Sequence, residues 1–336
     1  NEVLMIVPKT GEVRLVGPSL LPELGRGEKK GPLDFGGRWY GGVLGSDGCI
    51  YGMPCNADCV LKIKPAALVD KGKSKKGNDN SAAGSAPGGS EVEVCFTDPE
   101  GDPEVTTLPV EGLELGNWDY HGGVATQGGR VLLAVPMHAQ RVLAIFPEHG
   151  CAALVGEAIP QSALPPADSP IRAALGPKAQ SKIWQTGRYQ FGGAVLAPNG
   201  ASAYFLPYDA LQVLKVSPKT LPSHSAKKTL PELESLEVVP LEEGRCVSPQ
   251  ARRDFYRPNK WQNGIVGSDG LIYAIPVSAN AVLVIDPEND RVSTVAHDVV
   301  SAAGGWDKWE GGAVAPSDGA LYCVPQCGSG VLRILR

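Results

Sequence analysis

Hydrophobic and polar residues alternate along this chain in short runs, and turn residues separate the runs. Residues 260–287, KWQNGIVGSDGLIYAIPVSANAVLVIDP, give the cleanest example. The residues after Trp261 predict a first strand, Ser-Asp-Gly a tight turn, and residues 271–275 an alternating second strand that ends at Pro276. Val-Leu-x-Ile predicts a third strand, and Asp-Pro-x-x-Asp turns into a fourth.

The same pattern recurs along the chain. Copies start at five tryptophans, Trp39, Trp118, Trp184, Trp261 and Trp309. In each copy, six residues lead from the proline that ends the second strand to a Val-Leu pair: Val60-Leu61, Val142-Leu143, Val213-Leu214, Val282-Leu283 and Val331-Leu332. Half a further copy stands at the N-terminus, where Val3-Leu4 precedes Pro8. Since this start in mid-repeat begins with Asn1, the chain would fit a processed or excerpted piece of a longer protein.

Four antiparallel strands per unit, repeated about six times, predict an all-β chain that folds as one β-propeller domain over residues 1–336. The expected units are about 1–20, 39–110, 118–160, 184–240, 261–298 and 309–336. Both termini bring a third strand, so we expect six blades, one of them built from terminal pieces or left short; five is the alternative. Residues 70–90 are rich in Ser, Gly and Lys and predict a disordered insert.

Paired glycines precede the first strand segments, as Gly41-Gly42, Gly122-Gly123, Gly192-Gly193 and Gly311-Gly312. With the recurrent Tyr and Trp, they resemble kelch-type repeats, although a kelch tryptophan follows its glycine pair and here it precedes the pair. The element Asp-Gly-x-Ile/Leu-Tyr, at Asp47, Asp269 and Asp318, resembles quinoprotein or lactonase-type blades equally well. The resemblance implies the fold alone, because no enzyme family's catalytic residues can be placed on the chain.

The regular residues of the repeat have a structural interpretation beside each functional one. The five tryptophans would stack a ligand if they formed a ring, but packing between blades is favoured. The aspartates Asp47, Asp269 and Asp318 would suit a cation, but a turn role is favoured because Asp fits hairpin turns and two copies use other residues.

The residues in which the copies differ are better candidates for a site. Two residues after each closing proline stand Asn56, His138, Asp209, Ser278 and Cys327, a possible ligand or metal set at one mouth of the channel. His121, beside a glycine pair, differs from Tyr40, Phe191, Gln262 and Glu310 in the other copies. The basic and aromatic insert before Trp261 is a possible partner patch, formed by Arg245, Arg252, Arg253, Phe255, Tyr256, Arg257 and Lys260.

Composition narrows the function classes. The net charge of −5 with scattered basic residues requires neither a nucleic acid nor a membrane partner, and no apolar run reaches the length of a membrane span. Eight cysteines without a paired framework predict a reducing, intracellular compartment. The spacings Cys55-x3-Cys59 and Cys323-x3-Cys327 differ from a zinc knuckle and lack nearby histidines, so we expect no metal and no cofactor.

Nucleotide-binding and hydrolase motifs are absent from the sequence. The leading hypothesis is a non-enzymatic propeller scaffold that binds another protein through one face and its inserted loops. One alternative is a propeller enzyme, of lactonase or other hydrolase type or a lyase, with a small ligand or metal around Asn56, His138 and Asp209. A second alternative is a glycan-binding propeller that uses exposed tryptophans.

Overall fold

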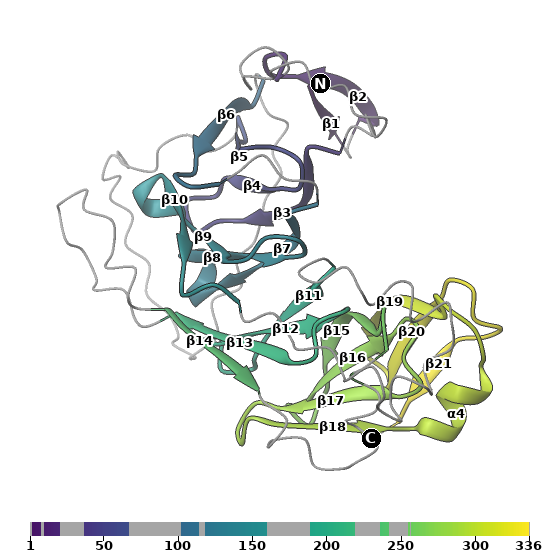
Figure 1. Ribbon diagram of the computed structural model, residues 1–336. Coiled ribbons are helices and arrows are strands. Elements are labelled where there is room, and N and C mark those ends of the chain that lie inside the picture. Colours follow the sequence, from purple (N-terminus) through teal and green to yellow (C-terminus); the bar gives the residue numbers. More distant parts are fainter. Residues whose placement is uncertain are drawn as a thin grey trace, which may run out of the picture.

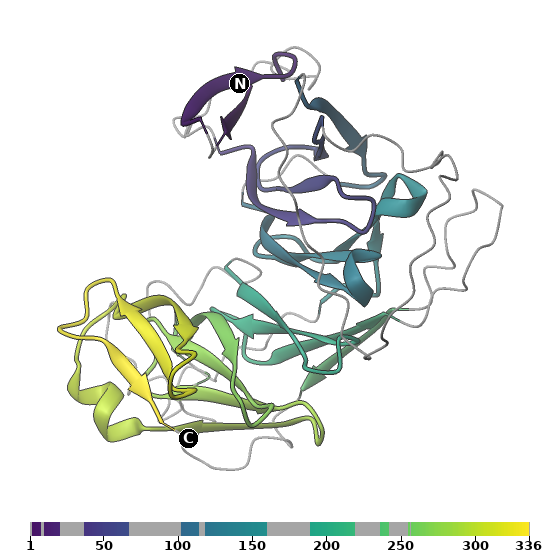
Figure 2. The same cartoon turned by 180° about the vertical axis from the view of Figure 1, so that it is seen from behind.

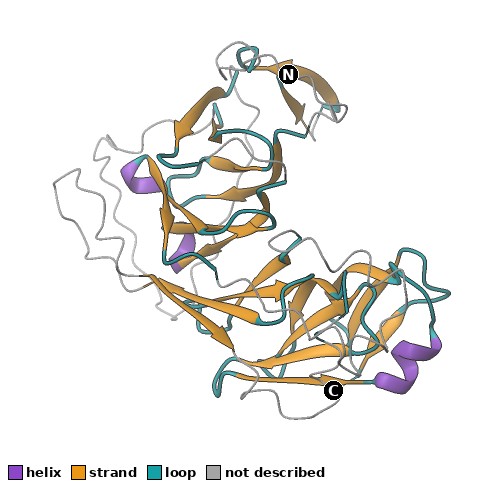
Figure 3. Cartoon of the chain, viewed as in Figure 1, coloured by secondary structure: helices purple, strands orange, loops and turns teal. Residues whose placement is uncertain are grey.

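The computed structural model describes residues 2–7, 10–20, 37–66, 102–113, 118–159, 189–218, 236–241, 255 and 257–335. Nearly all of their regular structure is strand (Figure 3). The exceptions are the short helix α4 (His297–Ala302) and two single 3-10 turns, η2 (Gln127–Gly129) and η3 (Pro147–His149). The insert predicted at residues 70–90 lies outside the described residues.

Six antiparallel sheets follow one another along the described chain. The first sheet holds β1 (Val3–Val7) and β2 (Glu12–Val16), and the second holds β3 (Trp39–Leu44), β4 (Ile50–Pro54), β5 (Cys59–Lys64) and β6 (Glu104–Pro109). The third holds β7 (Tyr120–Thr126), β8 (Val131–Pro136), β9 (Val142–Phe146) and β10 (Cys151–Val155). The fourth holds β11 (Phe191–Leu196), β12 (Ala203–Pro207), β13 (Val213–Pro218) and β14 (Leu236–Leu241). The fifth holds β15 (Trp261–Val266), β16 (Ile272–Pro276), β17 (Val282–Asp286) and β18 (Arg291–Val295), and the sixth β19 (Trp309–Val314), β20 (Leu321–Pro325) and β21 (Leu332–Ile334).

The sheets are arranged as the blades of a propeller. Within each four-stranded sheet the strands pair in chain order. The first strands of successive sheets contact one another, β3 with β7, β7 with β11, β11 with β15, and β15 with β19. Figures 1 and 2 show these first strands on the inner side of an arc, with β6, β10, β14 and β18 on its outer side. The predicted all-β propeller class, with four-stranded antiparallel blades, is confirmed.

The two ends of the chain do not share a blade in this arc. The two strands β1 and β2 form one sheet and the three strands β19 to β21 form another. These two sheets lie at opposite ends of the arc (Figures 1 and 2). The N-terminal pair and the shortened C-terminal sheet were both anticipated from the repeat count. The number of blades in a closed ring, six or five, stays a prediction.

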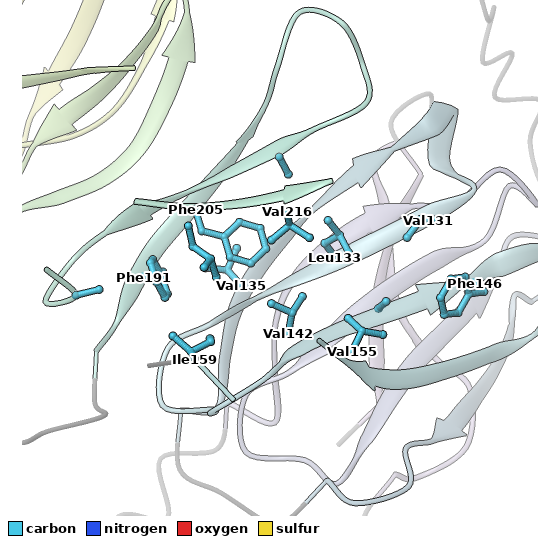
Figure 4. Packing of buried hydrophobic residues seen from close by; sticks show 14 residues of the cluster. Val131, Leu133, Val135, Val142, Phe146, Val155, Ile159, Phe191, Phe205 and Val216 are labelled. Carbon is cyan, nitrogen blue, oxygen red and sulfur yellow. The ribbon is translucent and has the colours of Figure 1, made fainter. Parts of the chain in front are cut away.

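The apolar core lies between neighbouring sheets. Figure 4 shows one cluster between the sheet of β7 to β10 and the sheet of β11 to β14, where Leu133, Val142 and Phe205 are among the fully buried side chains. The Val-Leu pairs of the third strands are buried in the four sheets that hold four strands, because both faces of these strands are covered. Each such side chain contributes about 1.5–3 kcal/mol through removal from water.

The tryptophans explain the fixed spacing between each closing proline and its Val-Leu pair. In β3, β15 and β19 the indole Nε1 donates a hydrogen bond to the carbonyl just before that pair, namely from Trp39 to Cys59 (2.8 Å), from Trp261 to Ala281 (2.8 Å) and from Trp309 to Gly330 (2.7 Å). In β7, the Tyr120 hydroxyl donates in the same way to the Arg141 carbonyl at 3.0 Å. Adding or removing one loop residue would break this bond, so the spacing is a structural requirement.

This geometry corrects the sequence alignment in two repeats. The residue opposite the closing proline is Trp39, Trp261 or Trp309 in three sheets, but Tyr120 and Phe191 in the other two. Trp118 therefore does not occupy the anchor position, and its side chain is 38% exposed. Trp184 lies outside the described residues. The position after the anchor is taken by Tyr40, His121, Gly192, Gln262 and Glu310, so Gly192 replaces the Phe191 of the sequence alignment.

The paired glycines make a bulge in each first strand. In β3, β7 and β19 the pairing register shifts between the anchor residue and the second glycine, and the first glycine has a left-handed φ, 75° at Gly41 and 76° at Gly311. In β11 the shift runs from Phe191 to Ala194, and the second glycine of the pair, Gly193, has the positive φ, 154°. In β15, Asn263 takes this position with φ 57°, a conformation that Asn tolerates better than most residues. The bulge also allows close packing, since a Cβ on Gly41 would lie 3.0 Å from the Gly122 Cα of the next blade.

Candidate functional site

The candidate functional surface lies along the innermost strands and the loops that precede them. The residue before each anchor, which is Arg38, Asp119, Gln190, Lys260 or Lys308, organises these loops. In four repeats its carbonyl accepts hydrogen bonds from the three backbone N–H groups that follow the closing proline, as Cys55, Asn56 and Ala57 do with Arg38. Its own N–H donates to the preceding repeat in each of the four blade junctions from β3 to β19.

Three of the five predicted channel-mouth residues link neighbouring blades. Asn56 Oδ1 accepts from the Trp118 N–H at 3.0 Å, Asp209 Oδ1 from the Asn259 N–H at 2.6 Å, and Ser278 Oγ from the Asp307 N–H at 3.2 Å. All three donors lie in the left-handed region, with φ between 51° and 65°. These oxygens thus hold a strained turn of the next repeat, which the sequence did not reveal.

The other two mouth residues lie in different surroundings. The His138 ring meets the Tyr189 ring edge to face, with centroids 4.6 Å apart. Cys327 is exposed after β20, in the last sheet. The set therefore has at least three structural members, and its role as a ligand site stays a prediction.

The predicted partner patch needs a correction at two residues. Lys260 is completely buried, and its Nζ donates to the Tyr208 carbonyl at 3.0 Å. Phe255 is also buried and packs against Trp261, with ring centroids 5.2 Å apart. Neither side chain is available to a partner, because both belong to the junction between blades. Arg257 is half-buried, and Arg245, Arg252, Arg253 and Tyr256 lie outside the described residues.

Burial also changes the chemistry of the two lysines at this position. It lowers the pKa of Lys260 to about 7, which the nearby Asp209 carboxylate partly opposes. Burial and the Arg257 charge lower the pKa of Lys308 to about 8. Lys308 Nζ donates to the Ala279 carbonyl at 2.8 Å. Both amines therefore point into the protein and serve the blade junctions.

The Asp-Gly aspartates close turns, as the sequence favoured. Oδ1 of Asp47 accepts from the Cys49 N–H, and Oδ2 accepts from the Tyr51 hydroxyl at 2.8 Å and from Lys62 Nζ at 3.0 Å. Asp269 and Asp318 bond the N–H two residues on and the following tyrosine in the same manner. Each carboxylate therefore stabilises its own turn and strand pair.

The fourth sheet obtains its carboxylate from the next blade. Its turn carries Asn199, and Asp290 from the β17–β18 turn takes over the contact with the tyrosine and the lysine of this sheet. Asp290 Oδ1 accepts from the Tyr204 hydroxyl at 2.7 Å and from Lys215 Nζ at 2.8 Å. The interaction therefore joins two blades.

Aromatic side chains gather at the blade junctions, on the innermost strands and in the loops next to them. The Tyr40 and His121 rings stack with their centroids 3.7 Å apart, and the ring centroids of Trp118 and His121 are 6.5 Å apart. The His138 N–H donates to the Trp118 carbonyl at 3.1 Å, which brings the His138 and Tyr189 pair next to this stack. We call these five residues the inner aromatic cluster. Sequence analysis singled out His121 and His138 but missed the aromatic neighbours that surround them.

A polar edge borders the inner aromatic cluster. Gln262 Nε2 donates to Glu310 Oε1 at 2.9 Å, across the β15–β19 junction. Burial, followed by the Glu310 carboxylate, raises the pKa of the Tyr40 hydroxyl. Burial, Asp209, Asp307 and Glu310 raise the pKa of Tyr208. Burial lowers the pKa of His121, so its ring is neutral at pH 7.

Thiols and metal ligands offer little chemistry in the part of the chain that is described. Burial raises the pKa of four thiols to about 11, so they stay protonated near neutral pH: Cys49, Cys55, Cys59 and Cys323. Among the described residues, no three His, Cys, Asp or Glu side chains form a group that could hold a metal ion. Within the same residues, no helix has the length and apolar character needed to cross a membrane.

The chain matches no protein-family model and no curated protein sequence. The kelch resemblance is therefore not supported. Similar folds occur among solved structures. Virginiamycin B lyase from Staphylococcus aureus is 14% identical, with a TM-score of 0.46 over 88% of this chain and 66% of the lyase. A protein described as a 6-phosphogluconolactonase from Bacteroides fragilis is 13% identical, with a TM-score of 0.48 over 98% of this chain and 72% of that protein.

A domain described as part of a two-component system is also among the similar structures. The extracellular domain of a hybrid two-component system from B. thetaiotaomicron is 9% identical, with a TM-score of 0.45 over 88% of this chain and 29% of that protein. This chain thus spans just under two thirds of the lyase and under a third of the two-component system protein. At these identities and TM-scores, the activities of those proteins carry no argument for this chain, whose function has to be inferred from its own residues.

Proposed function

We propose that this chain is a non-enzymatic binding module that holds another protein against its inner aromatic cluster. The observation that carries the proposal is the exposure of three rings, Tyr40 at 42%, Trp118 at 38% and Tyr189 at 39%. Within the described residues these are the only aromatic side chains among the exposed large apolar groups. Tyr and Trp are the residues most enriched in the energetic centres of protein interfaces.

The position of the rings supports the same proposal. Tyr40 lies on β3. Trp118 stands two residues before Tyr120, the anchor of the third sheet, and Tyr189 stands two residues before Phe191, the anchor of the fourth. Trp118 and Tyr189 both have left-handed backbones, with φ of 65° and 52°. Asn259 and Asp307 have the same conformation at this position of their repeats, so the backbone belongs to the repeat, and it is the exposed ring that distinguishes Trp118 and Tyr189. Tyr40 is part of a strand, and Trp118 and Tyr189 stand directly before β7 and β11, so the strands hold the rings in place before a partner arrives.

The enzyme alternative has less support from the geometry. It placed a ligand or metal around Asn56, His138 and Asp209, but Asn56 Oδ1 and Asp209 Oδ1 are already engaged in blade junctions. The glycan alternative relied on exposed repeat tryptophans, whereas Trp261 and Trp309 are buried and bonded to backbone carbonyls. The proposed setting is a reducing intracellular compartment, which the free thiols of Cys55 and Cys59 support.

Affinity purification from the native source tests the proposal. The full chain is compared with a Tyr40→Ala/Tyr189→Ala variant and with a Val299→Ser control, whose side chain is 62% exposed on α4, outside the cluster. We expect a stoichiometric partner with the wild type and the control and at least about a tenfold loss with the double variant, as for interface hot spots. Equal thermal unfolding of the three proteins shows that the fold is kept. A partner that the double variant retains, or no stoichiometric partner of the wild type, would overturn the proposal.

A further inference from the structure

Glu310 places an acidic side chain on the inner face that carries the inner aromatic cluster. Glu310 is exposed on β19, where it occupies the position after the anchor that Tyr40 and His121 occupy on β3 and β7. Its charge also contributes to the raised pKa of Tyr40 and of Tyr208. The Gln262 amide holds one carboxylate oxygen at 2.9 Å and so fixes the orientation of the group. The inner face therefore presents a carboxylate of fixed orientation together with the exposed aromatic rings.

The basic residues closest in sequence to these strands are directed elsewhere. Arg38, Lys260 and Lys308 stand just before three of the innermost strands, and all three are buried. Their charged groups donate to backbone carbonyls, Arg38 Nη1 to Leu20 and the two lysines to Tyr208 and Ala279. These three cations are thus engaged inside the blades, while Glu310 faces solvent.

Resting on the proposed function, we propose that the partner inserts a cationic side chain, arginine or lysine on a polypeptide segment, between the exposed rings and the Glu310 carboxylate. A cation over the face of Tyr or Trp is attracted by the ring, and arginine also stacks on such rings. The stack already covers one face of Tyr40, so the guest uses the remaining exposed ring surface. Glu310 supplies the counter-charge, and a planar guanidinium matches a carboxylate with two parallel hydrogen bonds.

Other guests suit the surface less well. An anionic segment would meet Glu310, and Asp307 lies near the same tyrosine, Tyr208. A purely apolar segment would bury the Glu310 carboxylate without a partner, which costs free energy. A basic segment satisfies the rings and the carboxylate together.

Peptide display on the full chain tests this inference. A random 12-residue library is selected on the wild-type protein after depletion on the Tyr40→Ala/Tyr189→Ala variant. We expect the recovered peptides to share an arginine or lysine. For a recovered peptide, replacing that arginine by the neutral isostere citrulline, or a lysine by norleucine, should weaken binding about tenfold. Glu310→Gln should weaken the parent peptide about three- to tenfold, whereas Glu288→Gln, an exposed glutamate on the β17–β18 turn, should have no effect.

The outcomes separate the two proposals. Peptides that depend on the cluster but lack a shared cation, or that bind Glu310→Gln as tightly as the wild type, would overturn the cationic guest and leave the binding module standing. A library that yields no peptide dependent on the cluster would contradict both.

Discussion

Replacing Lys260 with methionine should change the pH dependence of stability in a direction that the structure fixes. The amine is buried completely between two blades and donates to the Tyr208 carbonyl. Its pKa falls from 10.5 to about 7 on folding, mainly through burial. Between these two values the unfolded chain binds the proton that the folded chain has released. The free energy of unfolding of the wild type should therefore rise with pH in this window, because the penalty for burying the ammonium disappears.

The size of the effect follows from the same two pKa values. Where the unfolded chain binds one proton more than the folded chain, the free energy of unfolding rises by about 1.4 kcal/mol per pH unit. Between pH 7 and pH 10, Lys260 should add about 3 kcal/mol to the free energy of unfolding, counted relative to Lys260→Met. Thiols and tyrosines also titrate in this range, but they are common to both proteins, so the difference between the proteins isolates the lysine.

The assay is urea unfolding of both proteins at pH 7, 8, 9 and 10 under reducing conditions, followed by tryptophan fluorescence. A Lys64→Met variant, at an exposed position of β5, serves as the control and should show no such slope relative to the wild type. A difference between wild type and Lys260→Met that is flat or falls with pH would refute the reasoning. If Lys260→Met does not fold, Lys308→Met should show a similar rise that begins about one pH unit higher.

Three further changes test the blade junctions and the repeat. Asp290→Asn should lower the free energy of unfolding by about 1–3 kcal/mol, because it removes the charged acceptor of Tyr204 and Lys215. Thermal unfolding measures this loss, and a loss no larger than that caused by Glu288→Gln would contradict the prediction. Trp261→Phe should cost about 2–4 kcal/mol through the lost indole bond to Ala281 and the space left in a filled core, whereas Trp118→Phe should cost under about 1 kcal/mol in the same denaturant titration. Gly41→Ala should destabilise the protein by more than about 1 kcal/mol, because φ is 75° and the new Cβ would lie 3.0 Å from the Gly122 Cα. The matched change Gly128→Ala, at φ 66° with open space around the new Cβ, measures the backbone contribution alone. Equal losses of stability in the two variants would argue against the close contact at Gly41.

The fold could be read from the sequence because its rules are local and repeated. Strand alternation, Asp-Gly turns and the constant distance from proline to Val-Leu each reflect a contact within one blade. The anchor in two repeats was misassigned because tryptophan was matched by identity. Counting back 15 or 16 residues from each closing proline finds Trp39, Trp261 and Trp309 but also Tyr120 and Phe191. This distance was the available signal, and it reflects the register of the first two strands.

The contacts between blades could not be read in the same way. The Tyr204 hydroxyl donates to Asp290, 86 residues further along the chain. The sequence shows Asn199 where other repeats have an aspartate, and it shows Asp290, but nothing in it links the two positions. The inner aromatic cluster also arises from several repeats and from different positions in them, because Tyr40 and His121 follow their anchors whereas Tyr189 precedes its anchor by two residues. Lys260 looked like a surface charge because its neighbours in sequence are basic, whereas in the fold it is buried and donates to the Tyr208 carbonyl of the preceding blade.

The hydrogen bonds from the residue before each anchor to the preceding repeat connect nearest neighbours only. A chain of this kind behaves as a one-dimensional array, in which each unit is stabilised by its own interior and by the unit before it. Gain or loss of a whole unit then leaves every remaining junction with the same type of bond. Such a scaffold can change its length by duplication while each surviving blade keeps its structure, and new function can enter through single residues at the junctions.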